Sequence, residues 1–342
     1  MTSLPRSPLL VVGVPRSGTT WVARVLAEAT GADYVEEPDN HFRRPHAFRV
    51  KHALGKGEYP ELRPGDEAPE YALLWRRALA PADDARNPEP KAAQGRRRLT
   101  TRLLAGATPA AVSAAIAEPV AASLRLRAVG ALAVPAATAA STRPRIVKSV
   151  HAALALEWIL ERFDAVPLVV VRDPLNVLSS WCELGWIDQK RKDVLDELDP
   201  RSRAAFATRT GIAAPAADAS PLARAAWLVG ALTTSLLDAA ERNPGWVVAS
   251  HEALCESPPQ AFRRLCSRLE LPWSDGADEL LTQTNRPGQG YEIDRVSSEL
   301  PHAWRTRLSE PEAAEAQSVL EPFAFERRLA RVQSHDGRQE PA

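Results

Sequence analysis

Short runs of consecutive apolar residues mark the candidate strands of this chain. Residues 9–14 and 166–171 are almost entirely apolar, residues 145–150 and 246–250 are less complete versions of the pattern, and residues 32–35 are a shorter candidate. A strand that is apolar on both faces is typical of a parallel sheet covered by helices on both sides. The pattern therefore predicts a mostly parallel sheet.

Between these runs, apolar residues recur at the spacing of helices. Residues 19–30 show this spacing and end at Gly31, which favours a helix stop. Residues 174–183 are a second helix, with Asp173 as the N-cap and Pro174 as the first helical residue. Further helices are predicted over residues 153–163, 221–241, 259–270 and 310–320. Strands that alternate with helices predict an α/β fold with a doubly wound, mostly parallel sheet flanked by helices.

One stretch interrupts this alternation. Residues 76–145 are rich in alanine, carry scattered prolines and are basic around Arg96-Arg-Arg98. We interpret them as a helical insertion or cap, with residues 110–117 as one helical piece. The rest of the chain forms one domain over residues 1–330, followed by a polar C-terminal tail at residues 331–342.

Composition and charge narrow the class of protein. The 342 residues are 45% hydrophobic and 25% charged, with 43 basic and 43 acidic residues and a formal net charge of zero. This balance argues against a protein that coats nucleic acid. The three cysteines include no Cys-x-x-Cys pair, which favours a reducing cytoplasm over a disulfide scaffold. We find no secretory signal, and Arg125 and Arg127 argue against a membrane span in the alanine-rich stretch.

The loop after the first strand has the glycine spacing of a phosphate-binding loop. Gly13 and Gly18 are separated by four residues, between a predicted strand and a predicted helix. Backbone N–H groups and a helix N-terminus can hold an anion there. Thr19 occupies the position of the lysine in nucleotide triphosphatases, and Arg16 within the loop is the replacement cation. The alternative is a strand-to-helix turn that binds nothing.

A second motif lies after the 166–171 strand. Arg172 comes at the carboxyl end of that strand, where open α/β sheets bind ligands, and Ser180 lies two turns into the next helix. A guanidinium and a hydroxyl in this arrangement suit a phosphate group. Each residue alone also fits a structural role.

Together the two motifs resemble those of sulfotransferases that use 3′-phosphoadenosine 5′-phosphosulfate (PAPS). The segment from Pro15 to Trp21, PRSGTTW, resembles the loop that grips the 5′-phosphosulfate, and Arg172 with Ser180 resembles the 3′-phosphate motif. The resemblance implies a P-loop-like sulfotransferase fold. It also implies PAPS as co-substrate without a metal, and a nucleotide site made of Arg16, Ser17, Gly18, Thr19, Thr20, Trp21, Arg172 and Ser180.

The same resemblance points to a catalytic lysine. Lys148 lies 24 positions before Arg172, as does the family lysine that contacts the sulfuryl group and the bridging oxygen. The family's catalytic histidine would fall at Val150, and here the histidine is His151. A catalytic role for His151 and a structural role at a helix start both remain open.

A pair of glutamates offers another candidate for the general base. Glu36 and Glu37 precede Pro38. This Glu-Pro pair resembles the one in which carbohydrate-type and bacterial sulfotransferases often place the glutamate that they use as general base. Partial burial or a like-charged neighbour would raise the pKa of such a carboxyl towards the working pH. We favour Glu37, then His151, then Glu36, and solvated turn glutamates remain the alternative.

These observations predict an enzyme that transfers a sulfuryl group to a hydroxyl of a carbohydrate, lipid or small metabolite by in-line displacement. Arg16 and Lys148 would stabilise charge on the leaving phosphate. The basic cluster formed by residues 41–46 with Lys51 and His52 is a candidate for contacting the acceptor, and a solvated loop is the alternative. Two rival functions are a kinase-like phosphotransferase and an inactive nucleotide-binding descendant. The sequence leaves the acceptor and the oligomeric state open.

Overall fold

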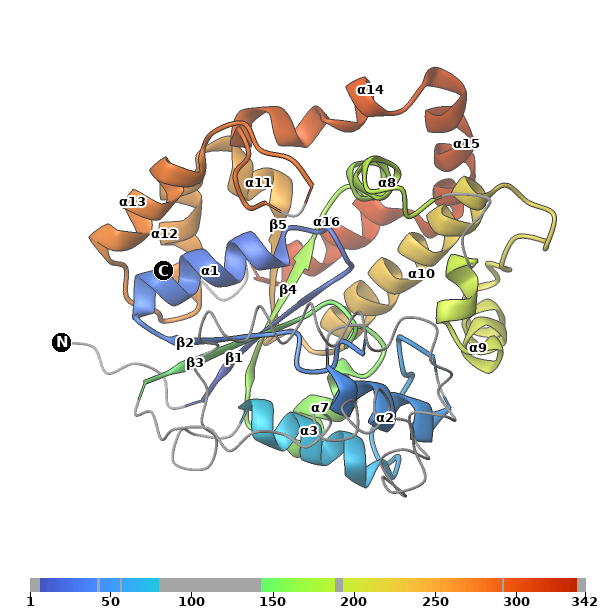
Figure 1. The fold of residues 1–342 in the computed structure, drawn as a ribbon, viewed down its shortest axis with the longest axis horizontal. Helices are drawn as coiled ribbons and strands as arrows, with labels where there is room; N and C mark the ends of the chain where they lie inside the picture. The colour runs from blue at the N-terminus through green and yellow to red at the C-terminus, as the bar shows by residue number, and fades with distance from the viewer. Residues whose placement is uncertain are drawn as a thin grey trace, which may run out of the picture.

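A parallel sheet at the centre of the protein organises the fold. The computed structural model describes residues 7–41, 44–55, 57–79, 143–187, 193–290 and 292–336. Its five strands lie in the order β2-β3-β1-β4-β5, and every neighbouring pair is parallel (Figure 1). They are β1 (Leu9–Gly13), β2 (Asp33–Glu36), β3 (Arg145–Ser149), β4 (Val166–Val171) and β5 (Val247–Ser250). The predicted α/β class with a mostly parallel sheet is confirmed.

The apolar runs form strands because both faces of the sheet are covered. Leu10 and Val12 of β1 pack into one buried cluster, whereas Leu9 and Val11 pack into the other. Successive side chains of a strand point to opposite faces, so a strand between two helical layers must be apolar throughout. All residues of β1 are buried accordingly.

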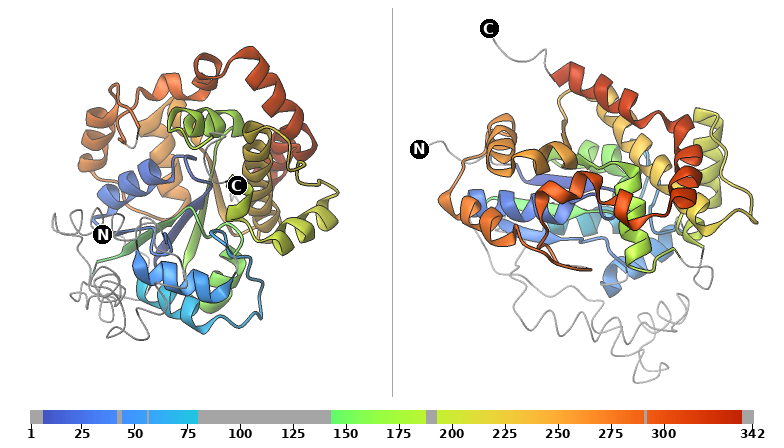
Figure 2. Two further views of the ribbon diagram at one scale, coloured as in Figure 1. Left: turned by 45° about the vertical axis from the view of Figure 1, so that its right-hand side comes forward. Right: turned by 90° about the horizontal axis from the view of Figure 1, so that it is seen from above.

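One face of the sheet is covered by α1 (Thr19–Thr30), α12 (Pro258–Arg268) and α13 (Asp275–Thr284), with α11 (His251–Glu256) beside them (Figure 2). The apolar side of α1 presents Val22 and Leu26 to the strands, where they meet Phe262 of α12. Gly31 ends α1 in a left-handed conformation, as the sequence predicts.

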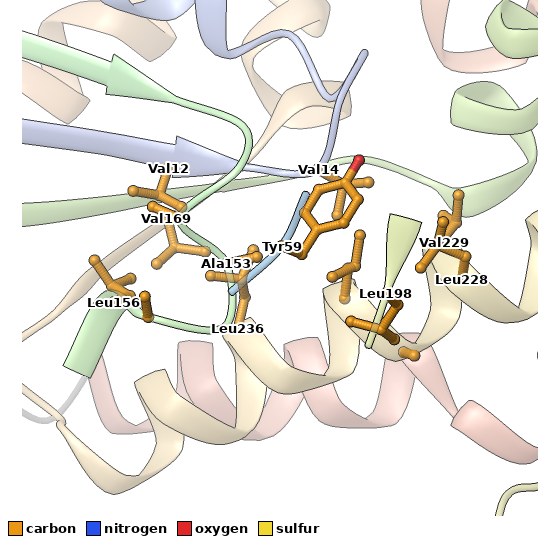
Figure 3. Packing of buried hydrophobic residues seen from close by; sticks show 14 of the residues in the cluster. Val12, Val14, Tyr59, Ala153, Leu156, Val169, Leu198, Leu228, Val229 and Leu236 are labelled. Carbon is orange, nitrogen blue, oxygen red and sulfur yellow. The ribbon is translucent and has the colours of Figure 1, made fainter. Parts of the chain in front are cut away.

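The other face carries α10 (Pro221–Arg242), α7 (Leu156–Arg162) and α8 (Pro174–Glu183). Val12 and Val169 from the strands gather there with Leu156 of α7 and Leu236 of α10 (Figure 3). Asp173 caps α8 by accepting a hydrogen bond from the Leu175 backbone, and Pro174 is the first helical residue, so this predicted cap is confirmed.

Several helices have bounds that differ from the prediction. The helix expected over residues 153–163 begins only at Leu156, after a turn, and α16 runs through Asp336, into the part expected to be a tail. The sequence pattern did not indicate α2 (Pro45–Leu54), α3 (Pro69–Leu79), α9 (Pro200–Thr210), α11, α13 or α16 (Phe325–Asp336). The remaining elements are η1 (Val194–Glu197), η2 (Ser297–His302), α14 (Trp304–Arg307), α15 (Glu310–Leu320) and η3 (Glu321–Phe323).

Most of the predicted insertion at residues 76–145 lies outside the described residues. Its described ends are the last turn of α3 and the first residues that lead into β3. Among the helices that the structure describes, none combines the length and apolar character needed to cross a membrane.

Candidate active site

The carboxyl ends of all the strands meet at one large cavity of about 1030 Å³. Parallel strands bring their carboxyl ends to one edge, and ligands of open α/β sheets bind there. Each strand is followed by at least one residue that lines the cavity: Pro15 and Arg16 after β1, Glu37 after β2, His151 after β3, Arg172 after β4 and His251 after β5. Every site residue predicted from the sequence, except Ser17, lines this cavity.

The loop between β1 and α1 has the shape of an anion-binding turn. Arg16 has a φ of 72° and Gly18 a φ of 90°, both left-handed. The helix begins at Thr19, so the unpaired N–H groups of its first turn open at this loop. The buried Ser17 Oγ has no hydrogen-bond partner among the described residues. The loop therefore offers donors that a bound anion would satisfy.

Arg16, Arg172 and Ser180 come together as one cluster. Arg16 donates through Nε to Ser180 Oγ at 2.9 Å, and Arg172 Nη1 donates to the Arg16 carbonyl at 3.0 Å. Arg16 Nη2 and Arg295 Nη2 both donate to the Gly290 carbonyl, at 2.8 and 2.9 Å. The two sequence motifs and the C-terminal segment thus meet in space. Hydrogen bonds tie Arg16 to this cluster, whereas Lys148 is bound elsewhere in the cavity.

Arg172 is a buried cation with donors that the described residues leave unpaired. Its side chain is buried, and its Nε and Nη2 have no hydrogen-bond partner within the described part of the chain. Burial is the main cause that lowers the pKa of Arg172 to about 10, so the guanidinium stays charged at neutral pH. A buried cation with unpaired donors is costly unless a ligand pairs with it. A phosphate group fits this requirement.

Glu37 and Lys148 form a buried ion pair that lines the same cavity. Lys148 Nζ donates to Glu37 Oε1, and Asn40 Nδ2 donates to Glu37 Oε2 at 2.5 Å. The sheet register explains the meeting, because Glu36 of β2 pairs with Lys148 of β3 and the Glu37 backbone N donates to the Lys148 carbonyl. This contact places a carboxylate, which can accept a proton, next to a cation, which can stabilise negative charge on a ligand.

The other two candidates for the general base lie in different surroundings. Glu36 lines the cavity but is only half-buried, and its carbonyl accepts a hydrogen bond from Arg44. His151 lies in the loop after β3, not at a helix start, and its buried ring is 2.9 Å from the Glu58 carboxylate. Lys51 is buried beside them and donates to the Glu58 carbonyl at 2.6 Å, so this part of the predicted basic cluster is internal.

Two residues of the site escaped the sequence analysis. His251 directly follows β5, and the rule that strand ends carry site residues could have found it. Its buried ring lies edge-on to Trp21 at 5.7 Å, and burial together with Arg172 lowers its pKa well below the usual value. Glu58 lies in a loop after α2, and no local motif marks it.

His251 also explains why the loop requires glycine at position 18. A Cβ on Gly18 would lie 2.1 Å from His251 Cδ2, and φ there is +90°. We expect Gly18→Ala to lower the free energy of unfolding by roughly 2 kcal/mol or more, because strain and overpacking add. Urea denaturation measures this change.

Gly31→Ala is the matched control, since Gly31 is also left-handed but has no atom within 4 Å of the added Cβ. It is expected to cost about 1 kcal/mol from backbone strain alone. Equal losses in the two variants would contradict the contact with His251.

One comparison with known proteins identifies a family for this chain. The family model described as "Sulfotransferase family" matches residues 8–218, which is more than half of the chain. A search of the curated proteins finds no match.

Three solved structures resemble this chain. The sulfotransferase domain from the Synechococcus PCC 7002 olefin synthase is 17% identical, with 95% of this chain and 96% of that chain covered and a TM-score of 0.43. The sulfotransferase domain from the curacin biosynthetic pathway is 15% identical, with 95% and 99% covered and a TM-score of 0.39. Sulfotransferase STF9 from Mycobacterium avium is 16% identical, with 93% and 77% covered and a TM-score of 0.39.

Proposed function

Because the chain belongs to the sulfotransferase family, we propose that it transfers a sulfuryl group from PAPS to a hydroxyl of a carbohydrate, lipid or small metabolite. The observation that carries the choice of donor is the buried Arg172 guanidinium, whose Nε and Nη2 lack hydrogen-bond partners in the described chain. An ordinary structural arginine would pair these groups with a carboxylate or a carbonyl. A donor nucleotide with a separate 3′-phosphate supplies the missing acceptor atoms.

The nucleotide would be held by two groups of residues. Arg172 and Ser180, with Arg16 beside them, suit the 3′-phosphate, because hydrogen bonds hold the three residues together and leave Arg172 Nε and Nη2 without a partner in the described chain. The N–H groups from Gly18 to Trp21 suit the 5′-phosphosulfate, because the N-terminus of α1 opens there, and the Ser17 Oγ beside them has no partner among the described residues. When bound, PAPS supplies the sulfuryl group and leaves as the 3′,5′-bisphosphate.

The acid–base chemistry falls to Glu37 and Lys148. Glu37 accepts the proton of the acceptor hydroxyl while the hydroxyl oxygen forms its bond to sulfur and the bond from sulfur to the bridging phosphate oxygen breaks. Lys148 stabilises the negative charge that builds on that bridging oxygen. The contact between the two side chains orients both before the acceptor binds.

We further propose that residues 1–330 form a single sulfotransferase domain located in the cytoplasm. The cysteines Cys182, Cys255 and Cys266 are unpaired thiols, and burial raises the pKa of each thiol. Thiols of this kind suit a reducing compartment.

The proposal is tested by turnover without added metal. Purified protein, ³⁵S-labelled PAPS and a library of sugars, sterols and small alcohols are expected to give labelled products and an equal amount of 3′-phosphoadenosine 5′-phosphate. Product is separated by chromatography and the bisphosphate is measured by its absorbance.

ATP with magnesium, added to the same library, serves as the control for a kinase. Phosphorylated products from ATP, with none from PAPS, would overturn the proposal in favour of phosphoryl transfer. Tight bisphosphate binding with no sulfated product would favour a nucleotide-binding descendant without transfer activity.

A further inference from the structure

The backbone of Glu37 adopts a conformation that is unusual for a residue with a side chain. Its φ is 46°, in the left-handed region, directly after the extended residues of β2. A residue other than glycine keeps such a φ only where the surrounding structure holds it there. The contacts that hold this backbone therefore also decide where the Glu37 carboxylate lies.

The left-handed turn bears on which side of the sheet the Glu37 side chain faces. Along β2, Tyr34 packs against one buried cluster and Val35 belongs to the other, because successive side chains of a strand point to opposite faces. Lys148 of β3 is in register with Glu36, so an extended chain would place Glu37 on the face opposite to Lys148. The left-handed φ breaks this alternation, and Lys148 Nζ donates to Glu37 Oε1.

Arg44 holds this turn through two backbone carbonyls. Arg44 Nε donates to the Glu37 carbonyl at 3.0 Å, and Arg44 Nη2 donates to the Glu36 carbonyl at 2.7 Å. These carbonyls belong to the two peptide planes on either side of the Glu37 Cα, so holding both planes fixes φ and ψ of Glu37. The Glu37 carbonyl also accepts from the Asn40 backbone N at 3.2 Å, which tightens the turn.

Asn40 holds the other end of the same residue. Asn40 Nδ2 donates to Glu37 Oε2 at 2.5 Å, on the oxygen that Lys148 leaves free, and the side chains of Asn40 and Glu37 are both buried. A donor of this kind stabilises the charged form of a carboxylate. Printed hydrogen bonds thus reach the backbone carbonyl and both carboxylate oxygens of Glu37, and its backbone N donates to the Lys148 carbonyl at 2.7 Å.

We propose that Arg44 and Asn40 are positioning residues for the general base: Arg44 fixes the left-handed backbone of Glu37, and Asn40 holds the carboxylate that this backbone places beside Lys148. This rests on the proposed function, in which Glu37 accepts the proton of the acceptor hydroxyl. Arg44 is not among the described residues that line the cavity, so it acts through Glu37.

The role of Asn40 can be measured by ¹³C NMR of protein labelled at its glutamate carboxyl carbons. The Glu37 signal is assigned by its loss in Glu37→Gln. Removing the Asn40 donor disfavours the charged carboxylate, so we expect Asn40→Ala to move the titration midpoint of Glu37 upward by about one pH unit. Asn40→Asp keeps the size of the side chain but adds a like charge, and we expect a further upward shift. An unmoved midpoint in both variants would remove the role assigned to Asn40.

Other titratable and charged groups around Glu37 stay the same in these two variants. They come from β2, β3, α2 and the loops that follow these elements, and they are Glu36, Asp39, Arg44, Lys51, Glu58, Tyr59, Lys148 and His151. The difference between the titration of the wild type and that of each variant therefore reports the change at Asn40.

The role of Arg44 is measured by a double-mutant cycle. If Arg44 fixes the backbone that brings Glu37 to Asn40, the two residues act together and their effects on the titration are not additive. Arg44→Met keeps the aliphatic stem and loses both donors. We expect the shift caused by Asn40→Ala to fall to less than half in the Arg44→Met background.

Two further backgrounds make this result specific. Arg44→Lys keeps the charge but brings one nitrogen in place of two, so it is expected to reduce the shift as well, and it serves where circular dichroism shows that Arg44→Met does not fold. Arg49→Ala is the matched control, because Arg49 lies on the same helix, pairs with Glu70 at 3.4 Å and is not among the residues that line the cavity, and the full shift is expected there. The full shift in the Arg44 variants would overturn the proposal.

Turnover separates this proposal from the proposed function. A base that binds its proton more tightly loses activity at a higher pH, so the acid limb of kcat against pH is expected to move upward in Asn40→Ala with the NMR midpoint. An acid limb that stays in place while the midpoint moves would overturn the assignment of Glu37 as the base that these residues position. If PAPS gives no sulfated product in the wild type, the proposed function fails, and the NMR titrations still decide whether Arg44 and Asn40 hold Glu37.

Discussion

Arg172→Ala is expected to weaken the binding of 3′-phosphoadenosine 5′-phosphate by about 100-fold or more. Truncating one partner of a buried charged pair costs roughly 2–5 kcal/mol, and each 1.4 kcal/mol is about a factor of ten in affinity. The loss is large because Arg172 Nε and Nη2 are buried donors with no partner in the described protein. Isothermal titration calorimetry without magnesium measures it.

Two further variants make the result specific. Arg172→Lys keeps the charge and loses the planar pair of donors, so it is expected to restore only part of the affinity. Arg263→Ala removes an exposed arginine that pairs with Asp278 outside the cavity, and its affinity is expected to equal that of the wild type. Unchanged affinity in Arg172→Ala would contradict the assignment of the 3′-phosphate to this residue.

Glu37→Gln is expected to lower kcat by about 1000-fold, in the range typical for loss of a general base. The amide keeps the size of the side chain but does not accept the proton of the acceptor hydroxyl. Lys148, which donates to Glu37 Oε1, would then keep only a neutral partner. Initial rates of sulfated product, at saturating PAPS and acceptor, measure this change.

The neighbouring residue provides the matched control for this variant. Glu36→Gln changes a half-exposed carboxylate on the same strand end and is expected to keep nearly the full rate. Binding of 3′-phosphoadenosine 5′-phosphate shows that Glu37→Gln is folded. A rate that survives in Glu37→Gln and is lost in His151→Gln would move the role of base to His151.

Some helices of the structure were not predicted from the sequence, and their residue patterns explain why. α9 begins at Pro200 after an Asp199 cap, the same local pattern that correctly marked Asp173 and Pro174 at the start of α8. The cap signal was present at α9, but few of its residues are buried, so it lacks a clear apolar stripe. α3 is different, because its buried residues Tyr71, Leu74, Trp75, Ala78 and Leu79 fall at helical spacing, so its apolar stripe was present in the sequence and could have predicted the helix.

The predicted site residues came together because they follow strand ends. Lys148 and Arg172 lie far apart in the chain from Glu37 and Arg16, yet the parallel sheet brings all of them to one edge. A motif that ends a strand in a parallel sheet can therefore be placed from the sequence without knowing any contact. The same rule could not have predicted Glu58, because Glu58 lies in a loop and not at the end of a strand. The antiparallel bridge between Gly57 and Leu198 holds this loop beside the cavity.

The sequence by itself determined the buried strands, the loop with the glycine spacing of a phosphate-binding loop, and which arginine, lysine and glutamate lie at the strand ends. These features are local, because they depend on burial pattern, glycine spacing and helix caps. Only the tertiary structure decided which donors are left unpaired and which carboxylate meets which cation. Those outcomes depend on contacts between residues distant in the chain, as in Lys148 with Glu37 and His151 with Glu58, and the local pattern around either partner does not encode them.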